Sequence, residues 1–355
     1  MKKILALVLA IAMVATLAAC GASEAEYTLG MGTVVSLEES KDGTAQADTT
    51  VATVVLDKDG KIVVCDIDVA QTKVKVDAGV VDKDGADLRT KTEKGADYGM
   101  AAAVNYGMDW NGDGVVKEWD AQAAAFEAYV VGKTADEVSA IKTKEVEGKG
   151  YVIADDEALL TAGCTIQITD FMAAVAKACK DDQAVTFTAS EGFKLGLAMA
   201  TDVSESTDAT ADADATVKLY SDYSAVVVDA EGKVLAAVID AVQPAVSVAK
   251  DGTISAKTFK DTKRALKADY GMAAAVNYGM DWNNDGVVKE WFEQSATLAK
   301  YVVGMNADQI TAIETQTVEG HGYVIPADED LLSAGCTIQI SSYQAVLAKA
   351  IANAK

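Results

Sequence analysis

A long internal repeat is the feature that most restricts the folds open to this chain of 355 residues. The segment Asp97–Trp119 recurs as Asp269–Trp291, 172 residues later, and its one change is Gly112 to Asn284. Repeats of roughly 20–50 residues build solenoids and propellers, whereas a period of domain length indicates a duplicated domain. We therefore expect a first repeat domain at residues 27–182 and a second at residues 190–355, joined near residues 180–189.

Each predicted copy begins with the pattern of a β-hairpin. Thr50–Leu56 and Lys61–Val69 are rich in β-branched and apolar residues, and they flank a turn at Asp57–Gly60. The second copy has the same order in Ala225–Val228, Asp229–Gly232 and Lys233–Ile239.

Helical patterns follow the strands in both copies. The spacing of one helix face is found at Trp119, Ala123, Phe126 and Val130, and again at Trp291, Ser295, Leu298 and Val302. Further helices are expected after the capping patterns Thr134–Glu137 and Asn306–Gln309, and at residues 170–180 and 342–354. Strands followed by helices indicate an α+β fold, in which helices pack on an antiparallel sheet.

The net charge is strongly negative, because 54 Asp and Glu residues oppose 31 Lys and Arg residues and give −23 at pH 7. This balance excludes a nucleic-acid binder that works through a basic surface. The single histidine, His321, also excludes a multi-histidine zinc site. The acidic tract Thr201–Thr216 and the matching Ser36–Thr50 lack an apolar period, so we expect both to be solvated loops.

The N-terminus has the pattern of an export signal. Lys2 and Lys3 precede an apolar run from Ile4 to Ala15, which is too short to span a bilayer comfortably. The ending Leu-Ala-Ala-Cys20 resembles the lipobox of bacterial lipoproteins, with an ordinary cleaved signal as the alternative. The resemblance implies that the signal peptide, residues 1–19, is removed and that Cys20 is acylated, with residues 20–26 as a short tether. The protein would then be extracytoplasmic and held at the cell membrane by its lipid anchor.

Four further cysteines are present, namely Cys65, Cys164, Cys179 and Cys336. An exported protein can form disulfides, but these cysteines have no CxxC spacing, and only Cys164 and Cys336 match within the repeat. We expect buried free thiols, with disulfides as the alternative.

The most specific chemical motif is an oxygen-rich loop in each copy. Asp109–Asp120 carries oxygen side chains at loop positions 1, 3 and 5 and a glycine at position 6, which suits the oxygen ligands and tight turn of a calcium site. The loop resembles an EF-hand loop and recurs from Asp281, with helices expected at Tyr98–Met108 before it and Lys117–Val131 after it. A plain turn is the alternative, since Asp, Asn and Gly also form turns.

The predicted calcium ligands follow from this alignment. An EF-hand closes with an acid at position 12, which is Asp120 in the first loop but Phe292 in the second. Glu118 and Glu290 are the late carboxylates shared by both loops, and we expect them to close a shortened loop. The full predicted set is Asp109, Asn111, Asp113, the backbone carbonyl of Val115, Glu118 and Asp120, and in the second loop Asp281, Asn283, Asp285, the backbone carbonyl of Val287 and Glu290.

Aromatic residues gather beside both loops, and two interpretations remain open. The rings could pack the junction between helix and loop, or they could line a pocket for a ring-stacking ligand. The cluster comprises Trp110, Trp119, Tyr98 and Tyr106 in the first copy, and Trp282, Trp291, Tyr270 and Tyr278 in the second.

A second resemblance concerns the order of segments in each copy. A strand pair is followed by Val131–Thr134 or Val303–Asn306, and then by Ala-Gly-Cys-Thr ahead of the last helix. This order is similar to that of FMN-binding-domain lipoproteins, in which the final threonine of a Ser-Gly-Ala-Thr element carries FMN as a phosphoester. The resemblance implies that Thr165 and Thr337 take the flavin position, near a helix N-terminus that suits a phosphate. The alternatives are a related domain without flavin, and a plain turn whose threonine caps the helix.

These patterns predict a binding protein rather than an enzyme. The first hypothesis is an exported, lipid-anchored protein with two calcium-stabilised repeat domains that binds a small molecule or a surface partner. The second is an extracytoplasmic electron carrier that holds FMN. A hydrolase is the least supported function, because the sequence displays no nucleophile and base pair.

Overall fold

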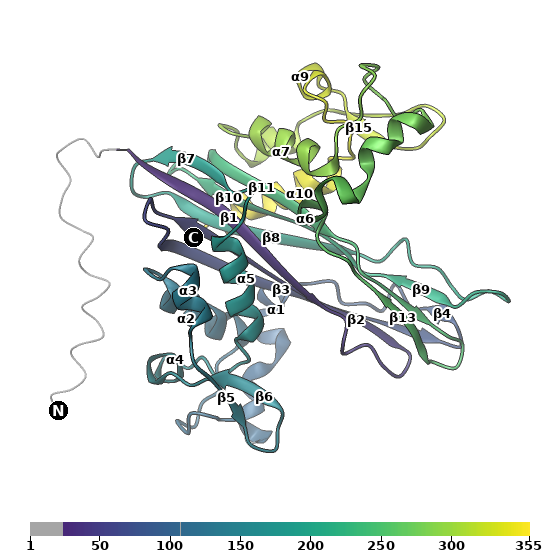
Figure 1. Cartoon of the computed structure of the whole chain (residues 1–355). Helices are drawn as coiled ribbons and strands as arrows, with labels where there is room; N and C mark the ends of the chain where they lie inside the picture. The colour runs from purple at the N-terminus through teal and green to yellow at the C-terminus, as the bar shows by residue number, and fades with distance from the viewer. Residues whose placement is uncertain (1–23, 107) are drawn as a thin grey trace.

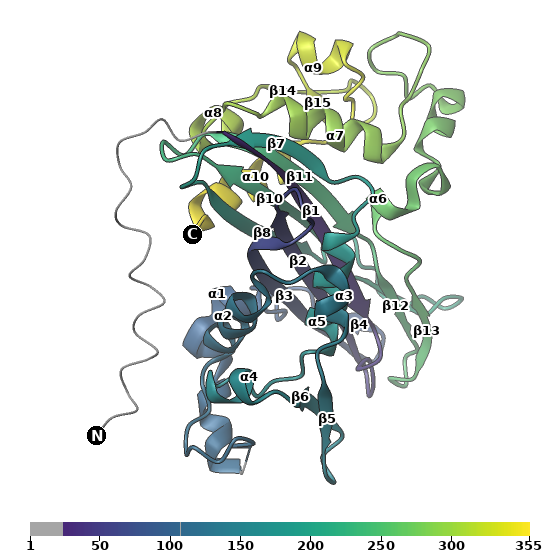
Figure 2. The ribbon, with the colours of Figure 1, turned by 60° about the vertical axis from the view of Figure 1, so that its left-hand side comes forward.

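The computed structural model describes residues 24–106 and 108–355. The predicted signal peptide and the predicted acylation site Cys20 lie outside these ranges. The described chain is a mixed α+β protein with antiparallel sheets and several helices, which confirms the α+β part of the predicted fold class. Two sheets pack face to face at the centre, and helices cover the outer face of each (Figures 1 and 2). Within the described ranges, no helix is long and apolar enough to cross a membrane.

The first sheet comes mainly from the N-terminal half, with the antiparallel strand order β4-β3-β2-β1-β7. β2 and β3 form the first predicted hairpin, which is paired from Thr44 opposite Lys75 to Leu56 opposite Ile62. The strands are β1 (Ala25–Ser36), β2 (Thr44–Leu56), β3 (Ile62–Asp77), β4 (Val80–Val81) and β7 (Val185–Ala189).

The C-terminal half forms a sheet with the order β11-β10-β8, and a smaller sheet beyond it with the order β13-β12-β9. β10 and β11 are the second predicted hairpin. The sheet of β8, β10 and β11 is separated from the sheet of β9, β12 and β13 at Leu219 and Pro244. Leu219 donates its N–H to the carbonyl of Pro244 at 3.0 Å, but Pro244 has no N–H to donate in the opposite direction. The strands are β8 (Lys194–Asp202), β9 (Ala215–Lys218), β10 (Tyr220–Val228), β11 (Val234–Val242), β12 (Ala245–Val248) and β13 (Ile254–Thr258).

The central strands bury both of their faces. Side chains alternate along a strand, so Val51 and Val55 of β2 point into the layer between the sheets, while Ala52 and Val54 face the helices. Tyr223 of β10 lies in the same inter-sheet layer and accepts a hydrogen bond from Thr33 of β1 at 2.9 Å. Both halves supply this layer, which also contains Leu29, Met31, Ala70, Leu195, Leu197, Met199, Ala225 and Val227.

Two helices cover each sheet. α2 (Trp119–Val130) and α5 (Thr169–Cys179) pack on the first sheet, and α7 (Trp291–Tyr301) and α10 (Ser341–Asn353) pack on the second. The predicted helix faces are buried, including Phe126 and Leu298. Glycine allows strand and helix to approach closely, because a Cβ on Gly30 would lie 2.1 Å from the carbonyl oxygen of Ala178, and one on Gly196 would lie 2.0 Å from that of Ala350.

The predicted capping boxes are confirmed. Thr134 and Asn306 are the N-caps of α3 (Ala135–Ser139) and α8 (Ala307–Thr311), and each box is complete. The other short elements are α1 (Lys91–Lys94), η1 (Gly95–Tyr98), η2 (Met100–Tyr106), β5 (Thr143–Val146), β6 (Tyr151–Ala154), α4 (Glu157–Thr161), α6 (Lys263–Leu266), η3 (Lys267–Tyr270), η4 (Met272–Tyr278), β14 (Thr315–Thr317), β15 (Val324–Pro326) and α9 (Glu329–Ser333), where η marks a 3₁₀ segment.

Two predictions of local structure are wrong. Ser36–Thr50 is not a solvated loop, because β1 continues to Ser36, β2 begins at Thr44, and Ala45 and Ala47 are buried. Alanine and threonine gave this strand too weak a hydrophobic pattern to predict it. Tyr98–Met108 is not an α-helix but is built from the 3₁₀ segments η1 and η2, separated by Gly99 at a φ of 74°. The helix-loop-helix context of an EF-hand is therefore present only on the C-terminal side of the loop.

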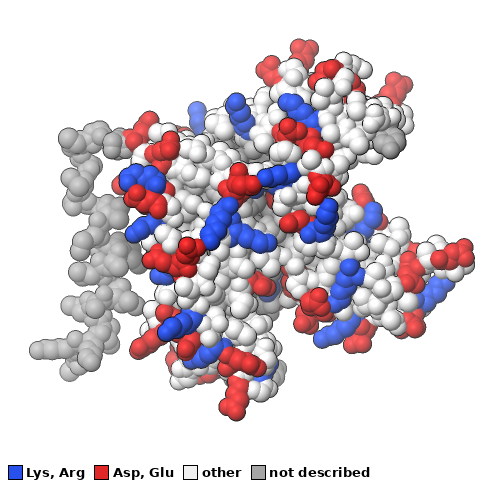
Figure 3. All heavy atoms as spheres, in the orientation of Figure 1, with Lys and Arg blue, Asp and Glu red and all other residues white. Residues whose placement is uncertain are grey.

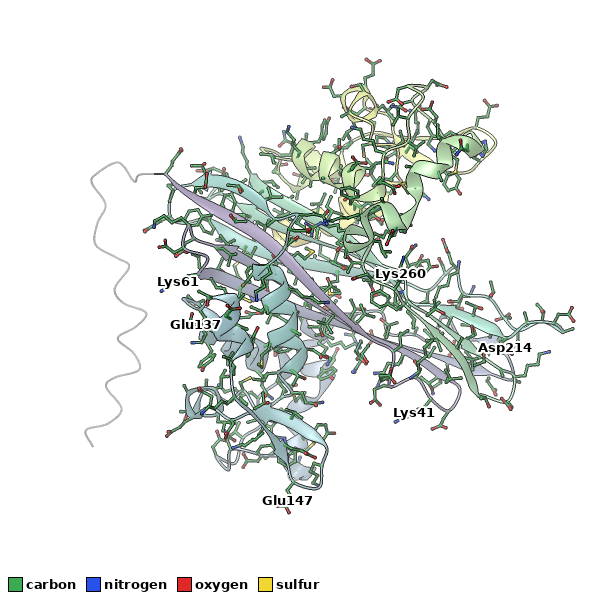
Figure 4. All side chains as sticks on the ribbon, in the orientation of Figure 1. Lys41, Lys61, Glu137, Glu147, Asp214 and Lys260 are labelled. Carbon is green, nitrogen blue, oxygen red and sulfur yellow. The ribbon has the colours of Figure 1, made fainter. Side chains whose placement is uncertain are left out.

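Charged side chains lie mainly on the outer surface. Acidic and basic groups are interspersed over the face that Figure 3 shows. Glu147, between β5 and β6, and Asp214, next to β9, extend outward from the ends of the molecule (Figure 4). The acidic tract around Asp214 is irregular between β8 and β9, as predicted.

A buried ion pair ties the segment between the two halves to both of them. The Nη2 atom of Arg264 in α6 lies 3.1 Å from a carboxylate oxygen of Asp181, and the two side chains are 9% and 7% exposed. Arg264 also donates to the carbonyl of Gln183 at 2.8 Å, and Asp181 accepts the N–H of Met31 in β1 at 3.1 Å. β7 follows this segment and pairs with β1, so the chain between the halves is part of the first sheet.

Replacement of Arg264 by alanine should lower the free energy of unfolding by about 3–5 kcal/mol, because it leaves the buried carboxylate of Asp181 without its counter-ion. Lys267→Ala is the matched control, since Lys267 pairs with Asp182 in the same region but both side chains are largely exposed. The control should cost less than about 1 kcal/mol. Urea denaturation followed by circular dichroism measures both values, and equal losses would contradict this account of the pair.

Candidate functional site

A cavity of about 660 Å³ opens beside the first sheet. Its volume is within the usual range of small-molecule sites. Strands β2 and β3, segments η1 and η2, helix α2 and the start of α5 each contribute to its wall. Six representative residues of the wall are Asp48, Gln71, Tyr98, Met100, Trp119 and Thr165.

A second cavity, of about 680 Å³, lies beside the second sheet. Much of its wall consists of the residues found 172 positions after those of the first cavity. Tyr270, Met272, Trp291, Gln294 and Thr337 take the places of Tyr98, Met100, Trp119, Gln122 and Thr165.

The aromatic residues belong both to the core and to the cavities. Trp119 is 2% exposed and packs edge-on against Phe171, with ring centroids 5.7 Å apart, yet both rings line the first cavity. Trp110, from the oxygen-rich loop, also lines the first cavity, and its ring centroid lies 6.3 Å from that of Tyr151. The predicted packing and pocket roles are therefore compatible. The side chains of Tyr106 and Tyr278 are outside the described part of the structure.

One lysine in each cavity lies against two aromatic rings. The Nζ atom of Lys91 is 5.2 Å from the ring centroid of Tyr98 and 5.5 Å from that of Trp119. Lys263 has the same position over Tyr270 and Trp291, at 5.4 and 5.3 Å. Burial lowers the pKa of each lysine, and nearby carboxylates oppose the shift.

A buried glutamine holds the threonine of the predicted flavin site. The Oε1 atom of Gln122 accepts the N–H of Thr165 at 2.8 Å and its hydroxyl at 3.2 Å, and Gln294 does the same for Thr337. Thr165 is 6% exposed and precedes Ile168, the N-cap of α5, by three residues. Threonine is therefore not the helix cap. The hydroxyl lines the cavity, but a phosphoester there requires that it leave Gln122.

The carboxylate of Asp109 organises the oxygen-rich loop. Its Oδ1 accepts the N–H groups of Gly112 and Asp113 at 3.0 and 3.2 Å, and its Oδ2 accepts that of Gly114 at 2.8 Å. Gly114, at loop position 6, has a φ of 82°, the left-handed conformation that favours glycine. In the second loop Asp281 accepts the N–H groups of Asp285 and Gly286 at 3.2 and 2.8 Å.

The asparagines at loop position 3 have unsatisfied oxygens. The Nδ2 atom of Asn111 donates to Asp113 at 2.9 Å and to the carbonyl of Leu160 at 3.0 Å. Its Oδ1 is buried and accepts no hydrogen bond from the described residues, and the same is true of the Oδ1 of Asn283. A buried oxygen without a partner costs free energy, which a bound cation or water would offset.

This donor set fits a hard cation. Asp109, Asn111 and Asp113 offer carboxylate and amide oxygens, the ligand type that calcium prefers. No group of three or more His, Cys, Asp or Glu side chains is placed to hold a metal in the described part of the chain. An ion in either loop would therefore need the asparagine and backbone oxygens, including the carbonyls of Val115 and Val287.

Glu118 and Glu290 make a contact that the sequence did not indicate. The two carboxylate oxygens of Glu118 accept the N–H groups of Met100 and Ala101 at 2.9 and 3.2 Å, which fastens η2 to the start of α2. Glu290 makes the same contacts in the second half, at the same distances. Asp120 is exposed and accepts the N–H of Ala121. Their roles as calcium ligands stay predictions.

The expectation of free thiols is confirmed. Cys65, Cys164 and Cys336 are buried, Cys179 is partly buried, and all four are free. Burial raises the pKa of Cys164 and of Cys336 to about 12, so both thiols are protonated and unreactive at neutral pH.

No protein-family model, curated protein or solved structure matches this chain. The resemblances to EF-hand loops and to FMN-binding-domain lipoproteins therefore rest on their motifs.

Three residues of the cavities were missed from the sequence. Gln122 had a signal, because it recurs as Gln294 on the otherwise apolar face of a helix. Lys91 had the same kind of signal, because Thr90-Lys91 recurs as Thr262-Lys263, whereas Asp170 had none, because Ser342 takes its place in the second half. Their meaning depends on which surfaces the fold places around the cavity.

Proposed function

We propose that this protein is an exported, lipid-anchored binding protein in which two copies of one domain each carry a small-molecule cavity and a calcium-stabilised loop. The pair of matched cavities is the observation that carries the proposal. Their volumes are about 660 and 680 Å³, and the lysine, aromatic, glutamine and threonine positions recur at one constant offset. The identical contacts of Glu118 and Glu290 support the duplication.

Binding is favoured over catalysis by the state of the buried polar groups. The hydroxyls of Thr165 and Thr337 are engaged by glutamine, and the buried thiols are protonated. The open aromatic walls remain available for contact with a ligand.

The calcium loop contributes directly to the cavity wall. Trp110 at loop position 2 and Val116 at position 8 both line the first cavity, and Trp282 and Val288 line the second. An ion that satisfies Asn111 would fix the loop and so fix these side chains. Calcium is in this way proposed to stabilise the ligand site rather than to act as a signal.

The unlipidated protein should bind two terbium ions per chain and emit luminescence sensitised by Trp110 and Trp282. Calcium should compete at about 0.1–1 mM, the range of extracellular sites. Asn111→Leu should weaken terbium binding to the first loop at least tenfold, because it removes the unsatisfied oxygen. Asn111→Asp keeps an oxygen at this position and should retain the binding. Luminescence that is silent, or equal in both variants, would rule out this site.

The cavities should bind the neutral dye Nile red, with an increase in its fluorescence. Ala103 and Ala275 line the two cavities, so the double variant Ala103→Trp, Ala275→Trp should fill them and abolish most of the increase. Ala102→Trp with Ala274→Trp is the matched control, because these neighbours are exposed. Equal dye binding by both double variants would contradict the small-molecule function.

The lipid anchor is proposed from the lipobox-like sequence. The mature chain would begin at acylated Cys20, and loss of Lys2 and Lys3 with the signal would change the net charge from −23 to −25. A body of this charge is repelled by anionic lipid, so the acyl chains must supply the attachment. The proposed location is the outer side of the cell membrane.

An FMN carrier is the second candidate function. One observation favours it, namely that Thr165 and Thr337 line cavities with aromatic walls, as a flavin site would require. Bound flavin would supply redox chemistry. The chain's own residues would contribute the ring-stacking walls and a lysine for the phosphate.

Intact-mass analysis of protein purified from the membranes of its host separates these possibilities. We expect acylation at Cys20, which Cys20→Ser should abolish together with membrane attachment, and no added mass at Thr165 or Thr337. A yellow protein with added flavin mass that Thr165→Val with Thr337→Val removes would instead support the electron carrier.

A further inference from the structure

We propose that each cavity binds a zwitterionic organic molecule, with its carboxylate on Lys91 or Lys263 and its ammonium group on Asp170 or Asp222. This inference rests on the proposed small-molecule function and adds the charge pattern of the ligand. A dipolar ligand is indicated because both cavities share a lysine that has no ion-pair partner among the described residues, and each also contains a nearby acid that has none.

The lysines are cations without an acidic partner. No carboxylate lies within ion-pair distance of Lys91 or Lys263 in residues 24–106 and 108–355, although both are partly buried and lie against two aromatic rings each. Contact with ring faces offsets part of the lost hydration but supplies no hydrogen-bond acceptor. A ligand carboxylate would supply it, and the resulting bond would be charge-assisted.

Three carboxylates line the first cavity, and two of them are already engaged. Glu39 pairs with Lys41 at 3.5 Å. Asp48 accepts hydrogen bonds from Gln46 and Gln71 at 2.7 and 2.8 Å. Asp170, at the start of α5, is exposed and has neither an ion pair nor a hydrogen bond within the described ranges. Partial desolvation and the charge of Asp48 raise its pKa, whereas Lys91 lowers it.

The second cavity has the same balance. Asp202 accepts the N–H and the hydroxyl of Ser204, each at 2.8 Å, and Glu205 pairs with Lys218 at 2.9 Å. Asp222 has no ion pair among the described residues, although the hydroxyls of Ser342 and Tyr343 lie close enough to lower its pKa by hydrogen bonding. Burial raises its pKa.

The acids proposed to bind the ammonium group, Asp170 and Asp222, occupy different positions of the repeat. Asp170 corresponds to Ser342 in the second half, and Asp222 corresponds to Thr50 in the first. Asp222 lies beside Ser342, so the two positions are neighbours, and each cavity has one acid and one hydroxyl residue there. Carboxylates raise the pKa of both lysines, with Asp48, Asp68 and Asp170 acting on Lys91 in that order, and Asp222 acting most strongly on Lys263.

The other nearby acids have structural partners. Asp68 accepts the N–H groups of Val69 and Thr92, and Asp240 accepts those of Ala241 and Arg264. Lys73 is exposed and lines the first cavity, but its equivalent in the second half is Ala245. The shared recognition set is therefore one lysine, one acid and the apolar and aromatic walls, which suits a molecule with an apolar body.

Isothermal titration calorimetry with a matched set of probes tests the charge pattern. We expect L-phenylalanine and L-phenylalanyl-L-phenylalanine to bind at two sites per chain. N-acetyl-L-phenylalanine lacks the ammonium group and L-phenylalaninamide lacks the carboxylate, so each should bind at least tenfold more weakly than L-phenylalanine. Lys91→Met should remove binding at the first site, whereas Lys58→Met, at an exposed turn, should have no effect.

A relocation of the acid distinguishes charge recognition from a structural role. In a chain whose second cavity is filled by Ala275→Trp, Asp170→Ser should weaken phenylalanine binding at least tenfold. The double variant Thr50→Asp, Asp170→Ser copies the arrangement of the second cavity and should restore the binding. Failure of this restoration in a folded protein would overturn the role of the acid.

The remaining outcomes separate this inference from the proposed function. Binding of N-acetyl-L-phenylalanine or of L-phenylalaninamide as tight as that of L-phenylalanine would overturn the zwitterion. If Nile red enters the cavities but neither phenylalanine nor its dipeptide binds, this inference fails and the small-molecule function stands. If the dye does not bind either, both fail.

Discussion

The buried layer between the two sheets is the constraint on which the rest of the structure depends. β2 and β10 bury both of their faces, so each sheet needs a second sheet on one side and helices on the other. In either half alone, the side chains of Tyr223 and Leu29, which are buried in the complete fold, would be exposed to solvent. Ion pairs reinforce this layer across the halves, because Lys349 pairs with Glu93, and Lys355 pairs with Asp66 and Glu127. The two cavities consequently lie on the two helix-covered sides of one shared core.

Much of the framework could be predicted from the sequence because its signals are local. Two hairpins, the helix face of Trp119 and the capping boxes at Thr134 and Asn306 all appear as predicted. The packing of one half on the other could not be predicted, because a strand that is apolar on both faces does not indicate what covers it. The cavities could not be predicted from the sequence either. Lys91 and Asp170 meet there only because β3, α1 and α5 are brought together by the fold, and no spacing along the chain records that arrangement.

The oxygen-rich loop forms part of the cavity wall. Glu118 links η2 to the start of α2, and the loop connects these two elements. The side chain of Trp110, in the loop, lines the cavity, so the position of the loop affects the cavity wall. The loop is rich in glycine and exposed, so it would lose much conformational entropy on ordering. An ion held by Asp109 and Asn111, as proposed, would offset that loss before a ligand binds. The ligand would then meet a preorganised wall, which would increase affinity without a new contact.

The early start of β1 has a geometric consequence for a protein held by acyl chains at Cys20. The strand begins at Ala25, so the predicted tether of residues 20–26 shortens, and an extended chain from Cys20 to Ala25 reaches about 18 Å at most. β1 begins at the end of the molecule opposite β9 and β13 (Figure 1). If the chain is anchored at Cys20, a tether this short would restrict the orientation of the protein as well as its location. The sheets would project outward with β9 and β13 farthest from the lipid, and neighbours on the same membrane would meet only the sides of the protein.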